Sequence, residues 1–228
     1  MVERPAGGPV ESESLSRTRR LCADLVDRTG IDGVGVAVFA TESTRDLVFA
    51  SDEVAEELDE LQFTVGEGPC LEAFRSHAPQ LHDDVSGRET LDRFPVFSAL
   101  AATAGAGSVY AYPLMIGEVP FGVLELYGHA CGALAAREDV TCRIFAQSIA
   151  HVVLAELDSG VGPFQPVGAR VFTRGNVHVA AGIVAVRLNV SVDEALVRLR
   201  GWAFAEQRRI TAIAREIVNG ERIDLAEM

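Results

Sequence analysis

The sequence predicts an α+β domain followed by a separate, smaller all-α domain. Between residues 14 and 157, short β-rich runs and glycine-containing turns alternate with stretches of helical apolar spacing. Residues 158–168, DSGVGPFQPVG, interrupt these patterns with three glycines and two prolines, as a linker does. From residue 169 to 228 only helical periodicity remains. We therefore expect a domain at 14–157, a linker at 158–168 and a helical bundle at 169–228.

The composition is that of a globular protein, because 48% of the 228 residues are hydrophobic and 23% are charged. Residues 1–13 are rich in proline, glycine, serine and glutamate, which predicts a disordered lead-in and no secretory signal. No apolar run approaches the roughly 18 residues that cross a bilayer, so we expect a cytoplasmic protein without a membrane partner. The four cysteines form no CxxC pair and no zinc-ligand pattern, which favours reduced thiols and no metal or cofactor.

The first domain is expected to begin with a helix and a hairpin. Apolar residues at 14–29 have helical spacing, and Gly30 follows as a typical helix end. The runs GVGVAVFA (33–40) and LVFA (47–50) flank a polar turn and predict two paired strands. The stretch 52–62 is acidic and poorly periodic, and no element is predicted there.

The middle of this domain contains turn residues with specific positions. Pro69, in the turn VGEGPC (65–70), is expected to open a short helix through Phe74, because its missing N–H would be unbonded there anyway. A strand at PQLHD (79–83) and a helix at FPVFSALAATAGA (94–106), ending in glycine, are predicted next.

Two strands and a long helix are expected to close the domain. The run 108–128 predicts a hairpin that turns at Gly117, with Pro113 and Pro120 toward strand margins or bulges. A long amphipathic helix is predicted at 137–157. Its expected apolar side consists of Val140, Ile144, Ile149, Val152, Val153 and Leu157. The order of elements predicts an antiparallel sheet flanked by helices.

Three helices are predicted after the linker. Asn189 is expected to end the first helix in a left-handed conformation, and Ser191 and Glu194 have the spacing of a capping box for the second. Thr211 is the expected cap of the third helix. The expected inward residues are Val177, Ala180, Ala181, Val184 and Leu188, then Leu196, Leu199 and Ala203, then Ile210, Ile213, Ala214, Ile217 and Val218. Three short helices need one another to bury these residues, which predicts a compact bundle.

Charge is distributed unevenly between the two parts. Residues 1–164 hold 11 arginines against 26 acidic residues, a net charge of −15, whereas residues 165–228 hold 9 arginines against 7 acids, a net of +2. There is no lysine, so arginine carries every cationic role. This asymmetry favours a polyanionic partner for the tail. The spacing of apolar residues in the tail allows, equally with nucleic-acid binding, a three-helix bundle that only dimerises and whose arginines are solvated.

Residues 16–157 resemble a GAF domain. The resemblance rests on GVGVAVF, on GEGPC followed by LEAF, on the paired strands SVYAYPLMIGEVPFGVLELY, and on the closing helix. It implies an antiparallel sheet, a sensory role through an unidentified small ligand, and homodimerisation through the terminal helices 14–29 and 137–157.

The tail resembles an ANTAR domain, which implies an RNA-binding antitermination regulator that binds paired stem-loops in nascent mRNA. The lysine that this family commonly has before the glycine is replaced by Ala181. The matching positions are Ala180, Gly182, Ser191, Glu194, Ala195, Leu199, Arg200, Ala203, Phe204, Ile213 and Ala214.

The candidate RNA-binding residues are the arginines of the tail and one aromatic residue. The planar fork of arginine suits phosphate oxygens, and an indole can stack on an unpaired base. Phe204 is expected to pack within the bundle instead. The set is Arg174, Arg187, Arg198, Arg200, Trp202, Arg208, Arg209 and Arg215.

The alternative is a GAF-type small-molecule binder or a thiol redox enzyme whose tail only dimerises. Cys70 follows a turn at the start of a helix, where the helix dipole can lower a thiol pKa. Some GAF-fold enzymes reduce free methionine sulfoxide with cysteines. Such chemistry requires Cys131 or Cys142 to approach Cys70, and nothing in their spacing indicates this, so we expect no enzyme.

Overall fold

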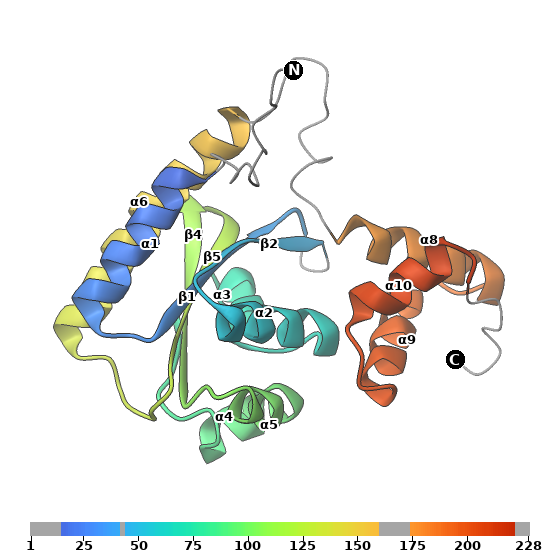
Figure 1. Ribbon diagram of the computed structural model, residues 1–228, viewed down its shortest axis with the longest axis horizontal. Helices are drawn as coiled ribbons and strands as arrows, with labels where there is room; N and C mark the ends of the chain where they lie inside the picture. The colour runs from blue at the N-terminus through green and yellow to red at the C-terminus, as the bar shows by residue number, and fades with distance from the viewer. Residues whose placement is uncertain (1–14, 42–43, 160–173, 222–228) are drawn as a thin grey trace, which may run out of the picture.

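The computed structural model describes residues 15–41, 44–159 and 174–221. Figure 1 shows a sheet domain (residues 15–159) and, beside it, a helical bundle (residues 174–221). The sheet domain contains α1 (Ser16–Thr29), β1 (Gly33–Phe39), β2 (Arg45–Ala50), α2 (Glu53–Val65), α3 (Pro69–Ser76), β3 (Gln80–His82), α4 (Arg88–Arg93), α5 (Pro95–Thr103), β4 (Ser108–Ile116), β5 (Val119–Gly128) and α6 (Ala136–Ser159). The bundle contains α8 (Gly175–Leu188), α9 (Val192–Ala205) and α10 (Ile210–Val218).

The described strands form one antiparallel sheet in the order β2-β1-β5-β4-β3, which confirms the predicted α+β class. Alternate residues face opposite sides of the sheet, so the strands contribute to two cores. One face packs against α1 and α6, which lie side by side in Figure 1. The other face packs against α2, α3 and α5. Pro113 lies within β4, next to an irregularity between Leu114 and Met115.

Helix α2 was not predicted, although its ends carry clear local signals. The side chain of Asp52 accepts the N–H of Ala55 at 2.9 Å, and Gly66 ends the helix with a φ of 75°. Its buried residues include Asp59, Glu60 and Gln62, so the helix has no continuous apolar stripe that hydrophobic spacing could reveal. The short helix α4 was also not predicted.

The predicted apolar side of helix α6 is confirmed in its second half, where Ile149 and Val153 are buried, but it was wrong for Val140 and Ile144, which are 55% and 57% exposed. Cys142 and Ala146 in the first half of the helix, and Ala150 after them, line the side that meets the sheet and α1. The helix continues through Ser159, so the predicted linker boundary at 158 was wrong. The rest of the predicted linker and the lead-in at 1–13 lie outside the described residues.

Among the described residues, one helix, Ala136–Asp158, is long and apolar enough to cross a membrane by length and composition alone. This is α6, whose inner face belongs to the core of the sheet domain. A helix that packs on one side in a core passes the same test, so its length and composition do not indicate a membrane span.

The bundle has the predicted core. The inward residues of α8, α9 and α10 share one apolar cluster, and Asn189 ends α8 with a φ of 53°. Ser191 accepts the N–H of Glu194 at 3.1 Å, but the Glu194 carboxylate binds Arg198 and completes no reciprocal capping box. The expected cap Thr211 was wrong: α10 begins at Ile210, and Arg209 occupies the capping position.

Candidate functional site

The eight predicted RNA-binding residues fall into two groups in the structure. Arg174, Arg200 and Arg209 contact α2 of the sheet domain. The other five lie on the bundle, and their hydrogen bonds and ion pairs are described below: Arg187, Arg198, Trp202, Arg208 and Arg215. The first group joins the two domains, which sequence reasoning did not anticipate.

Arg174 is buried, although it was expected to project into solvent. Only 6% of its surface is exposed, and its Nη2 lies 2.8 Å from Asp59 Oδ2 and 2.7 Å from Glu60 Oε2. Its backbone N–H donates to Asp46 Oδ1 at 3.0 Å, and its guanidinium lies 4.2 Å from the ring centroid of Phe63. Burial lowers the pKa of Arg174, but the charges of Asp59 and Glu60 outweigh this and leave it raised.

These groups belong to a buried charge cluster of Arg45, Asp46, Asp59, Glu60 and Arg174. Arg45 Nη1 lies 2.6 Å from Asp59 Oδ1, so one carboxylate joins an arginine of the sheet domain to an arginine of the bundle. Burial raises the pKa of Glu60, an effect that Arg174 partly opposes. A buried pair that loses one partner leaves an uncompensated charge, which costs about 3–5 kcal/mol.

Arg200 approaches the carboxyl end of α2. Its Nε donates to the Phe63 carbonyl at 3.2 Å, where the helix dipole favours a cation. Gly66 gives the guanidinium room, because a Cβ there would lie 3.0 Å from Arg200 Nη1. Burial lowers the pKa of Arg200 to about 10, with further contributions from Arg45 and Arg75.

Arg209 completes the contact at the amino-terminal half of α2. Its Nη1 lies 3.0 Å from Glu56 Oε1, and its Nη2 lies 3.0 Å from Glu57 Oε2. These side chains are about half exposed, so the two ion pairs stabilise the contact less than the buried cluster does.

An aromatic side chain anchors the same contact. Phe63 of α2 is buried and belongs to the apolar cluster of the bundle. We define the α2–bundle interface as Glu56, Glu57, Asp59, Glu60 and Phe63 against Arg174, Arg200 and Arg209. The signal for it was present in the sequence as the acidic run EELDE (56–60) opposite a basic tail.

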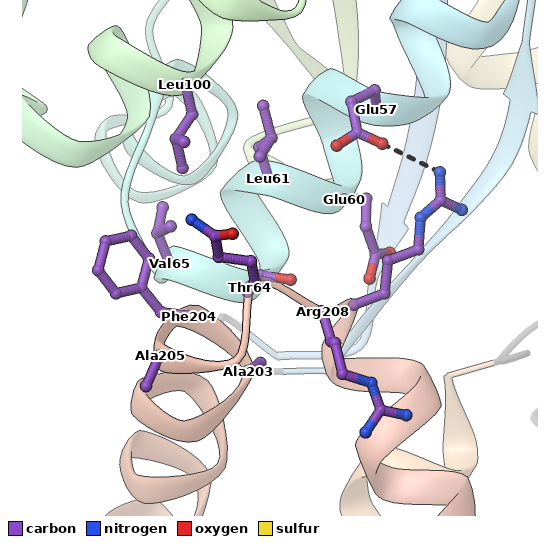
Figure 2. A pocket seen from close by; sticks show the side chains of 12 residues that line it. Glu57, Glu60, Leu61, Thr64, Val65, Leu100, Ala203, Phe204, Ala205 and Arg208 are labelled. Atoms are coloured by element: carbon purple, nitrogen blue, oxygen red, sulfur yellow. Dashed lines mark hydrogen bonds and ion pairs between the residues drawn. The ribbon is translucent and has the colours of Figure 1, made fainter.

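Beside this interface, the seam between the domains opens into a pocket of about 560 Å³. Figure 2 shows Leu61, Val65 and Leu100 of the sheet domain and Phe204 of the bundle gathered at its apolar end. Phe204 was expected to pack within the bundle, but 54% of its surface is exposed. It also lines a second pocket of about 390 Å³ with Val96 and Arg200.

Arg198, Trp202 and Arg208 have partners within the bundle, and Arg208 also lines the seam pocket. Arg198 binds Glu194 at 2.6 Å, Arg208 binds Glu206 and Glu216, and the Trp202 indole N–H donates to Glu206. Within the described residues, Arg187 and Arg215 are exposed, and their side chains make no hydrogen bond or ion pair.

A second polar site lies inside the sheet domain, between α2 and the sheet. Gln62 Nε2 donates to Glu125 Oε1 at 2.6 Å, and Gln62 Oε1 accepts the backbone N–H of Cys70 at 2.8 Å. Burial raises the pKa of Glu125 to about 7, with a further contribution from Asp59. Burial also raises the pKa of the Cys70 thiol well above its usual value, and Glu125 adds to this. Cys70 is therefore a protonated thiol at neutral pH.

The structure does not bring the other cysteines to Cys70. Cys142 lies in the core on the opposite face of the sheet, and Cys131 is exposed. The residues that thiol redox chemistry would need are thus separated.

A five-stranded antiparallel sheet with a helix pair on one face and a polar site under α2 on the other defines a sensor-type α+β domain. A family model described as GAF domain matches residues 12–154, and the chain therefore belongs to the GAF family. GAF domains are signal-sensing or ligand-binding domains. A comparison with curated proteins finds no match.

Three solved structures are similar to this chain at low sequence identity, and the two with a TM-score of 0.50 share its fold. The photoproduct state of GAF3 from Slr1393 of Synechocystis sp. PCC6803 is 20% identical, with 63% of this chain and 95% of that chain covered and a TM-score of 0.50. A domain of a two-component sensor histidine kinase protein from Sinorhizobium meliloti 1021 is 12% identical, with 66% and 94% covered and a TM-score of 0.50. Type II free methionine-R-sulfoxide reductase from Thermoplasma acidophilum is 19% identical, with 61% and 91% covered and a TM-score of 0.47.

Proposed function

We propose that this chain is a cytoplasmic RNA-binding transcription antitermination regulator. Its GAF domain senses a signal, and its bundle acts as an ANTAR domain that binds paired stem-loops in nascent mRNA. The observation that carries the proposal is the bundle itself: the positions that match the ANTAR pattern, Ala180, Ala195, Leu199, Ala203 and Ala214, form its core. Arginines are distributed around that core on an otherwise acidic chain.

The surface available to RNA in the described arrangement centres on Arg187 of α8 and Arg215 of α10. Both are exposed, and α8 and α10 pack against each other. Arg198 and Arg208 add cationic groups whose present partners are carboxylates of the bundle. Phosphate oxygens can replace these carboxylates, because both are anionic acceptors for a guanidinium fork. Ala181 is buried in the core, so a lysine at that position would not be accommodated as the core stands.

A homodimer formed through α6 fits the exposed face of that helix. Val140, Ile144, Gln147, His151 and Leu154 are exposed and recur at alternating spacings of four and three residues. This heptad spacing is that of a seam between paired helices, and a second copy of the same helix offers the matching face.

The proposal includes no catalytic activity. The alternative, a thiol redox enzyme, needs an accessible and ionised cysteine with a resolving partner. The raised pKa and burial of Cys70, and its separation from Cys131 and Cys142, argue against that chemistry.

The test is binding of the full-length protein to a two-stem-loop RNA at low and moderate salt. We expect Arg187→Ala/Arg215→Ala to weaken RNA binding and to reduce its dependence on salt. Each phosphate contact that is lost lowers the number of counterions released when the protein binds. The matched control is Arg88→Ala/Arg137→Ala, which removes two exposed arginines from the sheet domain. Equal weakening in both variants, or no binding by the wild type at low salt, would contradict the proposal.

A further inference from the structure

We propose that α2 holds the bundle in a closed state in which its acidic residues occupy arginines that RNA phosphates would otherwise bind. This inference rests on the proposed RNA-binding function and adds its regulation. Arg174, Arg200 and Arg209 are candidate RNA-binding residues, and each is bound to an oxygen of α2. In the closed state, therefore, RNA and α2 compete for the same side chains.

The chemistry of the interface is that of phosphate recognition. Arg209 directs its two terminal nitrogens at two carboxylates, and Arg174 directs Nη2 at two others. Carboxylates and phosphates present the same kind of charged oxygen to a guanidinium, which makes an acidic helix a competitor for an RNA backbone. The run EELDE (56–60) thus supplies four carboxylates within one and a half turns of helix.

The buried part of the interface favours two discrete states over gradual loosening. Asp59 is shared between Arg45 and Arg174, and both arginines lie over the ring of Phe63. Withdrawal of Arg174 alone would leave Asp59 and Glu60 buried with too little positive charge. Either the cluster is complete, or the domains separate far enough for water to solvate all of it.

The rest of the seam is poorly filled, which permits separation. Phe204 lines two pockets in the seam, of about 560 and 390 Å³. Interfaces that never open are packed as densely as protein interiors. The contact consists of one aromatic anchor, Phe63, with charged pairs around it. Such a contact is specific and can still be released.

The same helix also faces the polar site inside the GAF domain. Gln62 binds Glu125 and the Cys70 backbone from one side of α2, while its neighbours Glu60 and Phe63 meet the bundle from the other. A signal that shifts α2 against the sheet therefore changes both contacts at once.

The experiment compares full-length wild type with Glu56→Gln/Glu57→Gln and with Glu60→Gln. Both variants keep every candidate RNA-binding arginine. The charge-matched control for the double variant is Glu89→Gln/Glu118→Gln, because both of these carboxylates are exposed on the sheet domain away from the bundle. Two quantities are measured for each protein: hydrogen exchange of α2 and α8, and affinity for a two-stem-loop RNA.

We expect faster exchange in α2 and at the start of α8 for both variants, and RNA binding tighter by about threefold to tenfold for the double variant, as two half-exposed ion pairs allow. Glu60→Gln should act at least as strongly, because it removes a carboxylate from the buried cluster. The control should match the wild type in both measurements.

The other outcomes separate the two proposals. If exchange increases but RNA affinity stays at the wild-type value, α2 does not compete with RNA and this inference is overturned while RNA binding stands. If exchange does not change in either variant, the carboxylates do not hold the closed state. RNA binding can also be absent from the wild type and from variants whose hydrogen exchange shows an open interface. In that case the proposed RNA-binding function is wrong, and so is the proposed competition between α2 and RNA.

Discussion

The fold strongly alters the ionisation of the Glu125 carboxyl. It lies on β5 under α2, and burial raises its pKa to about 7. An unfolded chain ionises this carboxyl near 4.5, its ordinary value. Folding therefore becomes less favourable as pH rises between these two values, because the folded protein must retain a proton that the unfolded chain has released.

We predict that Glu125→Gln stabilises the protein above pH 7 and has little effect below pH 4.5. The amide still accepts from Gln62 but cannot ionise, and the difference in unfolding free energy should approach about 3 kcal/mol. Denaturant unfolding of wild type and variant at pH 4.5 and pH 8 measures this difference in unfolding free energy. The pKa shifts of the other acidic residues are common to both proteins and cancel in the comparison. A difference that does not change with pH would contradict this account.

The four cysteines should differ sharply in reactivity in the native protein. Cys22, Cys70 and Cys142 are buried, whereas Cys131 is exposed and donates to Asp84. We predict that an aromatic disulfide reagent labels Cys131 alone before unfolding, and slowly, because the hydrogen bond to Asp84 raises the pKa of this thiol. Cys131→Ser should abolish the native signal. Rapid labelling of Cys70 would reopen the redox alternative.

At the scale of elements, capping residues decide where helices begin. Ser191 accepts an N–H of α9, whereas Thr211, which the sequence suggested for the same role, is the second residue of α10 and caps nothing. The difference lies in backbone conformation, since a cap must stand just outside the helix.

We predict that Ser191→Ala destabilises the bundle by about 1 kcal/mol. Thr211→Ala should change its stability by less than about 0.5 kcal/mol, because no cap is lost. Fluorescence of Trp202, the single tryptophan, follows unfolding of the bundle in denaturant. Equal losses in the two variants would show that Thr211 has a structural role that its position does not reveal.

At the scale of the whole molecule, the exposed face of α6 and the α2–bundle interface lie on opposite faces of the sheet, as Figure 1 shows. Dimerisation through α6 would therefore leave the bundle accessible. Acidic residues of α2 bind the bundle, and we expect the negative charge elsewhere on the GAF domain to repel stray nucleic acid.

We predict that Val140→Asp/Ile144→Asp weakens dimerisation at least about tenfold, because charges in an apolar helix seam are costly. Both residues are exposed in the single chain, so the helical content should not change. Light scattering across a concentration series measures the effect. Val179→Asp, at a similarly exposed apolar position of α8, is the control. A wild type that remains monomeric, or a variant that dimerises as well as the wild type does, would refute the α6 seam.

Features with short-range causes could be predicted from the sequence. Gly30, Pro69, Gly117 and Asn189 each mark a helix end, helix start or turn where the structure has one, since backbone conformation depends on the residue itself and its neighbours. The core of the bundle was predicted for the same reason, because three helices with one apolar stripe each have few ways to bury them.

The sequence by itself thus determined the α+β fold class of the GAF domain, the core of the helical bundle that follows it, and the charge asymmetry between the two. Only the tertiary structure decided that Val140 and Ile144 of α6 are exposed, that 53–65 is a helix, and that its acids bind Arg174 and Arg209. The physical reason is distance along the chain. Partners separated by more than one hundred residues meet through packing and long-range charge, and no local pattern encodes which arginine an acidic helix will face.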